Sequence, residues 1–210
     1  MDRRRFLQNA SLSTLGVVAT TSVIGCNNST KNTAVVVSTY TVIKPIVIAT
    51  WRVPNATAKA WEVLQNGGSS LDAVEQGCMI EEADVKNSSV GKGGFPDRDG
   101  NVTLDACIMD KDGNYGAVMC VQNITHVISL ARKVMEKTPH VILAGDGAEK
   151  FGYEQGFKKE NLLTESSKKA WEKWKETSQY KPIINIENHD TIGMLAIDTN
   201  GDISGACTTS

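Results

Sequence analysis

The chain has 210 residues, and 22 Lys and Arg against 24 Asp and Glu give a formal net charge of −2. Hydrophobic residues make up 40% and charged residues 22%, which is typical of a globular protein and too apolar for a disordered chain. No basic excess is present, so a nucleic-acid partner is not expected. Length and composition therefore favour a single folded domain behind any leader segment.

Residues 1–26 are predicted to form an export signal. A basic head with a twin-arginine pattern at residues 3–5 precedes an apolar stretch over 12–24 that is too short for a comfortable membrane span. The residues up to Cys26 resemble a lipoprotein cleavage box. Either Cys26 carries a lipid anchor, or ordinary signal cleavage falls between Cys26 and Tyr40, and the sequence leaves both open. We expect the mature protein in the periplasm.

The predicted elements alternate helices with β-hairpins. We expect a buried strand at 45–51, helices at 56–66 and 69–82, a glycine-rich loop at 89–94, strands at 102–109 and 115–121, helices at 125–137, 148–155 and 165–176, an exposed linker at 178–188, and strands at 191–198 and 203–209. Helices packed on antiparallel hairpins predict a layered α/β fold.

Capping and turn residues support these bounds. Asn55, Ser69 and Thr164 are each placed to cap the helix that follows them. Asp112-Gly113 and Asn200-Gly201 are strong hairpin signals.

Several motifs with known chemistry are incomplete here. Gly91-Lys92-Gly93-Gly94 is not a phosphate-binding loop, which needs four residues between its glycines and Ser or Thr after the Lys, so a turn is expected. His126 and His140 have no carboxylate or Cys at ligand spacing. The cysteines at 107, 120 and 207 lie in apolar strand-like segments, which favours buried free thiols. Neither a metal nor a cofactor is expected.

The segment Asn188-His189-Asp190-Thr191-Ile192-Gly193-Met194 is the most informative part of the chain. By periodicity alone, Thr191 only begins a strand. A Thr hydroxyl is a poor nucleophile unless a base is adjacent. Cleavage between Asp190 and Thr191 would give Thr191 a free α-amine with a pKa of about 7.7–8.0, which suits a general base at neutral pH.

Three segments carry a resemblance to a known family: 189–194, 89–110 and 131–140. They resemble the glycosylasparaginase (aspartylglucosaminidase) family of N-terminal-nucleophile hydrolases, with matching motif order from about residue 44 to 210. The resemblance implies an αββα sandwich, here incomplete. The polar residues after Cys26 predict a tether over 27–43. The resemblance implies an N-terminal (alpha) subunit at 44–190 and makes 191–210 the beginning of a truncated C-terminal (beta) subunit. A homodimer of processed protomers is also implied.

The resemblance implies a function as well. The chain would cleave itself at Asp190–Thr191, with His189 helping to hold the junction, and would then hydrolyse the amide between N-acetylglucosamine and asparagine in a small glycosylated asparagine substrate. Thr191 would be the nucleophile. Other matching positions are Trp51, which would line the substrate pocket, Ser89, which would lie beside the nucleophile, and Thr209, whose hydroxyl would stabilise the nucleophile and the oxyanion. If the resemblance is set aside, the sequence predicts only structural roles: Trp51 would be a tryptophan of the hydrophobic core, and Ser89 would cap a loop.

The length of the hairpin loop determines which residue lies opposite Thr191, and so bears on the role of Thr209. A two-residue loop at Asn200-Gly201 would pair 199 with 202 and put Thr191 opposite Ser210. A three-residue loop at 199–201, with Gly201 in the left-handed region, would pair 198 with 202 and put Thr191 opposite Thr209. We predict the three-residue loop, in which both hydroxyls lie on one side of the sheet.

Two departures from the family leave other functions open. The chain stops at Ser210, before the family's substrate-clamping residues, so we expect the 210-residue chain to be unstable and inactive while its full-length parent is active. Phe95 stands where many relatives carry a polar residue. The rival functions are an L-asparaginase or isoaspartyl peptidase of the same family, and an inactive exported fragment.

Overall fold

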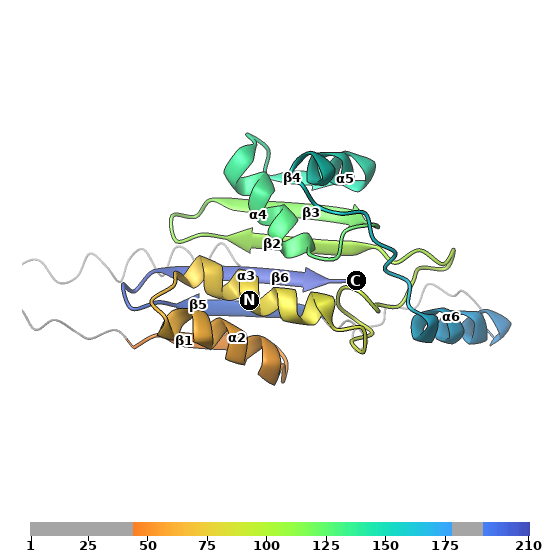
Figure 1. The fold of residues 1–210 in the computed structure, drawn as a ribbon, viewed down its shortest axis with the longest axis horizontal. Helices are drawn as coiled ribbons and strands as arrows, with labels where there is room; N and C mark the ends of the chain where they lie inside the picture. Colours follow the sequence, from red (N-terminus) through yellow and green to blue (C-terminus); the bar gives the residue numbers. More distant parts are fainter. Residues whose placement is uncertain (1–43, 178–190) are drawn as a thin grey trace, which may run out of the picture. The chain divides into compact units, whose positions relative to one another are not determined.

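The computed structural model describes residues 44–177 and 191–210. Their strands form one six-stranded sheet in the order β1-β5-β6-β2-β3-β4 (Figure 1). The sheet is mixed, because β3 and β4 run parallel while every other neighbouring pair is antiparallel. The strand bounds are β1 (Ile46–Ala49), β2 (Leu104–Met109), β3 (Tyr115–Val121), β4 (Ile142–Ala144), β5 (Ile192–Ile197) and β6 (Ile203–Thr209).

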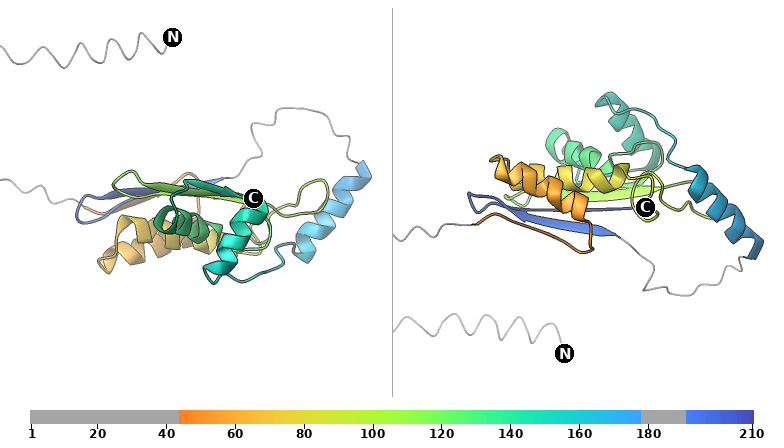
Figure 2. Two further views of the ribbon diagram at one scale, coloured as in Figure 1. Left: turned by 90° about the horizontal axis from the view of Figure 1, so that it is seen from above. Right: turned by 60° about the horizontal axis from the view of Figure 1, so that its bottom comes forward.

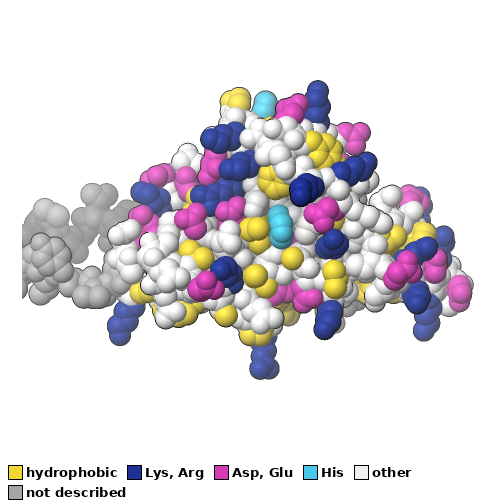
Figure 3. Space-filling model, viewed as in Figure 1, with side chains coloured by type: hydrophobic (Ala, Val, Ile, Leu, Met, Phe, Trp, Pro, Cys, Tyr) yellow, Lys and Arg dark blue, Asp and Glu magenta, His cyan; other side chains and the backbone are white. Residues whose placement is uncertain are grey.

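The helices are α2 (Pro54–Gln65), α3 (Ser70–Ala83), α4 (Val127–Lys137), α5 (Gly145–Glu154) and α6 (Glu165–Thr177). Figure 2 shows α2 to α5 on one face of the sheet, with α6 beyond its end. The outer surface of this helical layer carries charged side chains of both signs (Figure 3). In the part of the chain that the structure describes, no helix is both long and apolar enough to span a membrane.

The hydrophobic core lies between these helices and the sheet. Alternate strand residues such as Leu104, Ile108 and Met194 are fully buried against helical residues such as Val74 and Ile128. This is the alternation expected of strands with one covered face.

The other face of the sheet is open. Ile48 is 55% exposed and Leu195 is 48% exposed, so the prediction of a buried strand at 45–51 is wrong: only one face of β1 is covered. The described residues form one helical layer on one β layer, which confirms the α/β class. A second sheet and a second helical layer do not occur among residues 44–177 and 191–210.

The open face also corrects the prediction for the cysteines. Among the described residues, Cys107, Cys120 and Cys207 are exposed free thiols, whereas Cys78 on α3 is a buried free thiol. A strand-like apolar segment does not reveal which of its faces is covered, and Cys107 and Cys207 lie on the uncovered one.

Most element bounds agree with the predictions to within a few residues. The first helix begins at Pro54 rather than 56, with proline in its first turn and no side-chain cap from Asn55. The predicted caps of α3 and α6 are confirmed, because the Asp72 and Ser167 amides donate to the hydroxyls of Ser69 and Thr164. β4 was not predicted, since three residues are too few for a periodic pattern. The predicted linker at 178–188 lies outside the described residues.

Candidate active site

The β5–β6 hairpin brings Thr191 and Thr209 together. Ile192 pairs with Thr208, and at the other end Ile197 pairs with Ile203. The same register puts Thr191 opposite Thr209, which confirms the three-residue loop. Ile192 and Thr208 are buried on the helical side, so the alternation of the strands turns both neighbouring hydroxyls to the open face. Directly opposed residues of this kind have Cβ atoms about 4.5–5.5 Å apart.

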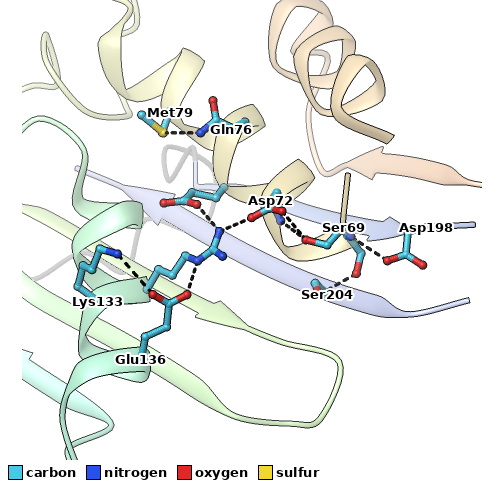
Figure 4. A network of polar contacts seen from close by, with 11 residues as sticks. Ser69, Asp72, Gln76, Met79, Lys133, Glu136, Asp198 and Ser204 are labelled. Atoms are coloured by element: carbon cyan, nitrogen blue, oxygen red, sulfur yellow. Dashed lines mark hydrogen bonds and ion pairs between the residues drawn. The ribbon is translucent and has the colours of Figure 1, made fainter. Parts of the chain in front are cut away.

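The hairpin loop explains this register. The Asp198 amide donates to the Asp202 carbonyl at 3.1 Å, and Gly201 has a φ of 86°, a left-handed conformation that glycine adopts without strain. One carboxylate oxygen of Asp198 accepts from the amides of Asn200 and Asp202. Its other oxygen accepts from the Ser70 amide at 3.0 Å, which fastens the loop to the start of α3. Figure 4 shows Asp198 and Ser204 beside this end of the helix.

The residues after β1 bind the backbone of the proposed nucleophile. Trp51 donates from Nε1 to the Thr191 carbonyl at 3.0 Å, and the Thr50 hydroxyl donates to the same oxygen at 3.3 Å. The Thr50 hydroxyl also accepts from the Gly193 amide at 2.9 Å. Trp51 is 54% exposed, so it is not a core tryptophan. The structure therefore brings two predicted site residues, Trp51 and Thr191, into direct contact.

Ser89 lies beside the end of β6. Its carbonyl accepts from the Ser210 amide at 3.1 Å, so it is next to the residue that follows Thr209. Its hydroxyl donates to Asn87 Oδ1 at 3.1 Å, which stabilises the loop. Gly94, at the other end of the same loop, lies so close to the Ser210 side chain that a Cβ there would overlap it.

A cavity of about 300 Å³ opens beside the two threonines. It is lined by residues from three strands and the start of β5, including Asp105, Cys107, Thr191, Cys207 and Thr209. Cys107 pairs directly with Cys207 across β2 and β6. A hydrogen bond from the Cys207 thiol lowers the pKa of Cys107 to about 6, and the same bond raises the pKa of Cys207. The cavity is lined mainly by apolar side chains such as Val118 and Met119, and the hydroxyls of Thr191 and Thr209 lie at its wall.

Besides Thr50, a second residue near the site was not predicted from the sequence. Glu82 is fully buried and accepts hydrogen bonds from the Thr208 hydroxyl at 2.8 Å and the Ile128 amide at 2.9 Å. Its other oxygen lies 3.3 Å from His126 Nδ1, a contact between residues 44 positions apart that sequence spacing did not indicate. Burial raises the pKa of Glu82, and the bonds from His126 and Thr208 oppose that rise. The spacing of Val74, Cys78 and Glu82 along one buried helical stripe is the signal that could have indicated it.

Two predicted residues, His189 and Asp190, lie outside the described residues. Within the described ranges no group of three or more His, Cys, Asp or Glu side chains is arranged to hold a metal ion. The described side chains around the two threonines are hydroxyls, the Trp51 indole, the thiols of Cys107 and Cys207, and the Asp105 carboxylate.

The family of the chain follows from comparison with known sequences. Residues 33–210 match the model of the asparaginase family, Asparaginase_2. The chain belongs to this family. An asparaginase-family relative from Elizabethkingia miricola, named N(4)-(beta-N-acetylglucosaminyl)-L-asparaginase, is 62% identical over 168 residues, covering 80% of this chain and 49% of the relative.

Two further asparaginase-family relatives are more distant. A Mus musculus protein with that same name is 37% identical over 79% of this chain and 57% of its own length. A Xenopus laevis protein named isoaspartyl peptidase/L-asparaginase is 41% identical over 77% of this chain and 53% of its own length. The chain thus spans about half the length of the curated relatives it matches.

Proposed function

We propose that this chain belongs to a self-processing amidohydrolase that cleaves the bond between N-acetylglucosamine and asparagine, with Thr191 as its nucleophile. The observation that carries the proposal is the register of the β5–β6 hairpin, which sets Thr191 opposite Thr209 on the open face. The contact of Trp51 with the Thr191 carbonyl supports it. The names of the Elizabethkingia and mouse relatives favour the same substrate.

The first reaction is self-cleavage. The Thr191 hydroxyl attacks the Asp190 carbonyl, and its proton passes to a base, for which the Asp190 carboxylate is the nearest candidate in sequence. Collapse of the tetrahedral adduct breaks the Asp190–Thr191 C–N bond, protonates the nitrogen and leaves an ester on the Thr191 oxygen. Water then hydrolyses the ester, which frees the α-carboxylate of Asp190 and restores the Thr191 hydroxyl beside its new α-amine. His189 helps to hold the junction in the reactive conformation.

The second reaction is hydrolysis of the substrate. The Thr191 α-amine accepts the hydroxyl proton while the oxygen attacks the side-chain carbonyl of the glycosylated asparagine. The Thr209 hydroxyl stabilises the negative charge on the oxyanion, and Trp51 and Ser89 shape the pocket beside it. The protonated α-amine then gives its proton to the amide nitrogen, the amide bond breaks, and the amino sugar leaves while an aspartyl ester remains on Thr191. Water then hydrolyses that ester and releases aspartate.

Mass spectrometry of the complete gene product tests the self-cleavage. We expect a break between Asp190 and Thr191 that disappears in Thr191→Ala, while Thr209→Ala still cleaves at the same bond. A complete gene product that stays intact would contradict the proposal and favour the inactive exported protein.

Substrate assays separate the leading function from its rival. The rival is an asparaginase or isoaspartyl peptidase, which the name of the Xenopus relative favours. We expect the processed complete gene product to hydrolyse N-acetylglucosaminyl-asparagine with a higher kcat/KM than free asparagine or an isoaspartyl dipeptide. The reverse order of kcat/KM would establish the rival.

We further propose that the protein is exported to the periplasm, with Cys26 as a candidate lipid attachment site, and that processed protomers form a homodimer. The basic head and apolar stretch of residues 1–26 support export. Cell fractionation with the mass of the mature N-terminus tests the first two points. Light scattering of the purified complete gene product tests the third.

A further inference from the structure

The β5–β6 hairpin is fastened to α3 at both of its ends. At the loop end, the Ser70 amide donates to Asp198, and the hydroxyls of Ser70 and Ser204 lie 3.0 Å apart. At the end that carries the two threonines, the Thr208 hydroxyl donates to Glu82 at 2.8 Å. The two contact points on the helix are separated by 12 residues, or about 18 Å, so α3 acts as a rigid support along the hairpin.

Glu82 joins more than the helix and the hairpin. Its carboxylate also accepts from the Ile128 amide at the start of α4. Its backbone carbonyl accepts from the Lys92 amide at 2.8 Å, and Gly91 packs directly on its Cα. Gly91 and Lys92 belong to the loop that carries Ser89. One buried residue therefore connects the strand that carries Thr209 with the loop that carries Ser89.

We propose that Glu82 is a positioning residue for the proposed nucleophile pair and acts through Thr208. This inference rests on the function proposed above. Thr208 pairs with Ile192 and precedes Thr209, so its orientation sets where the next hydroxyl points. Glu82 and Thr208 are both 0% exposed, so bulk water does not reach the carboxylate to replace this bond. A hydroxyl bound to a carboxylate is also held more strongly than one bound to a neutral acceptor.

Ser204 provides a matched control position, because its hydroxyl binds α3 as that of Thr208 does but lies far from the two threonines. Ser204 lies on β6, on the same buried face as Thr208, and its hydroxyl contacts a residue of the same helix. It differs in being at the loop end of the hairpin, four residues from Thr208. Removal of either hydroxyl should lower stability, but only removal of the Thr208 hydroxyl should disturb Thr209.

The experiment uses the complete gene product with Thr208→Val, Thr208→Ser and Ser204→Ala. Mass spectrometry measures the fraction of chains that are processed, and kcat is calculated per processed chain. A variant that folds poorly therefore does not appear to have a lower kcat. We expect Thr208→Val to lower this kcat about tenfold, since small misplacements of reacting groups cost one to two orders of magnitude. Thr208→Ser, which keeps the hydroxyl, should restore most of it. Ser204→Ala should lower Tm and leave kcat per processed chain unchanged.

Equal kcat per processed chain in Thr208→Val and wild type would overturn the inference, and so would an equal loss in Ser204→Ala. If Thr208→Val yields no processed chains, Glu82→Gln takes its place, because it keeps the side chain's shape and an acceptor oxygen but removes the charge. We then expect kcat per processed chain to fall about threefold, and no change would overturn the inference. A wild-type protein that neither cleaves itself nor hydrolyses the substrate would instead overturn the proposed function.

Discussion

Gly91→Ala should destabilise the protein more than a glycine replacement at any open turn. Gly91 has a φ of 67° and packs against the last turn of α3, so that an added Cβ would lie less than 3.0 Å from three backbone atoms of Glu82. Backbone atoms inside a helix cannot swing away as the end of a flexible side chain can. The alanine therefore has to displace either α3 or the loop that carries Ser89.

The magnitude follows from two separate costs. A left-handed conformation costs an alanine about 1–2 kcal/mol, and overpacking a close contact costs about 1–3 kcal/mol more. Gly113 is the matched control, because its φ is 82° and a Cβ there would meet nothing within 4 Å. Gly113→Ala should therefore show only the conformational cost, and Gly91→Ala should lose about 1–3 kcal/mol beyond it.

Urea unfolding of the complete gene product measures both losses. The free energy of unfolding is compared between variants with similar dependence on urea concentration, so that the midpoint reports stability. Because the loop also carries Ser89, Gly91→Ala should lower the processed fraction, while Gly113→Ala should not. Equal losses of stability in the two variants would refute the claim that close approach to Glu82 is what requires a glycine.

Three further predictions concern the network on α3 and the site. Arg132 forms ion pairs with Asp72, Glu75 and Glu136. Burial alone would raise the pKa values of Asp72 and Glu136, but Arg132 lowers both below their ordinary values. Arg132→Gln should therefore lower the free energy of unfolding by about 1–2 kcal/mol at pH 7, and by progressively less below about pH 4 as the carboxylates become protonated, which unfolding measurements from pH 3 to 7 would reveal. Asp198→Ala should cost about 2–3 kcal/mol in urea unfolding, because it leaves the buried Ser70 amide and two partly buried loop amides without their acceptor. Asp110→Ala, in the similar but more exposed turn, should cost about 1 kcal/mol. Trp51→Phe removes the bond to the Thr191 carbonyl and should lower kcat/KM per processed chain about fivefold, the equivalent of about 1 kcal/mol. An unchanged kcat/KM would contradict a role of Trp51 at the site.

The parts of the fold that the sequence predicted depend on local chemistry. A carboxylate that caps its own turn and a glycine in the left-handed region act within five residues, so the loop from Asp198 to Asp202 and its register could be predicted from sequence alone. That register in turn predicted which hydroxyl faces Thr191. The helix starting after Ser69 depends on equally local chemistry, because the Ser69 hydroxyl that caps it and the Asp72 amide that donates to that hydroxyl are three residues apart.

The parts that could not be predicted depend on what lies across the sheet. Periodicity indicates that a strand has two kinds of face but does not reveal which faces are covered, so the exposure of Ile48 and Cys207 was not anticipated. The contact between Glu82 and His126 joins residues 44 positions apart, and that between Glu82 and Thr208 joins residues 126 apart. No local pattern relates such residues, and only the packing of α3 and α4 on β6 brings them together.

In the proposed mature form, Thr191 is the first residue of its subunit, and chain ends fray unless they are fastened. The fold counters this in two ways. β5 lies inside the sheet, paired on one side with β1 and on the other with β6, so both edges of the nucleophile's strand are hydrogen-bonded. The Thr191 carbonyl also accepts hydrogen bonds from Thr50 and Trp51, which directly follow β1. A new N-terminus placed on an interior strand thus keeps its geometry after the bond before it is broken, whereas the same residue on an edge strand would depend on one neighbour alone.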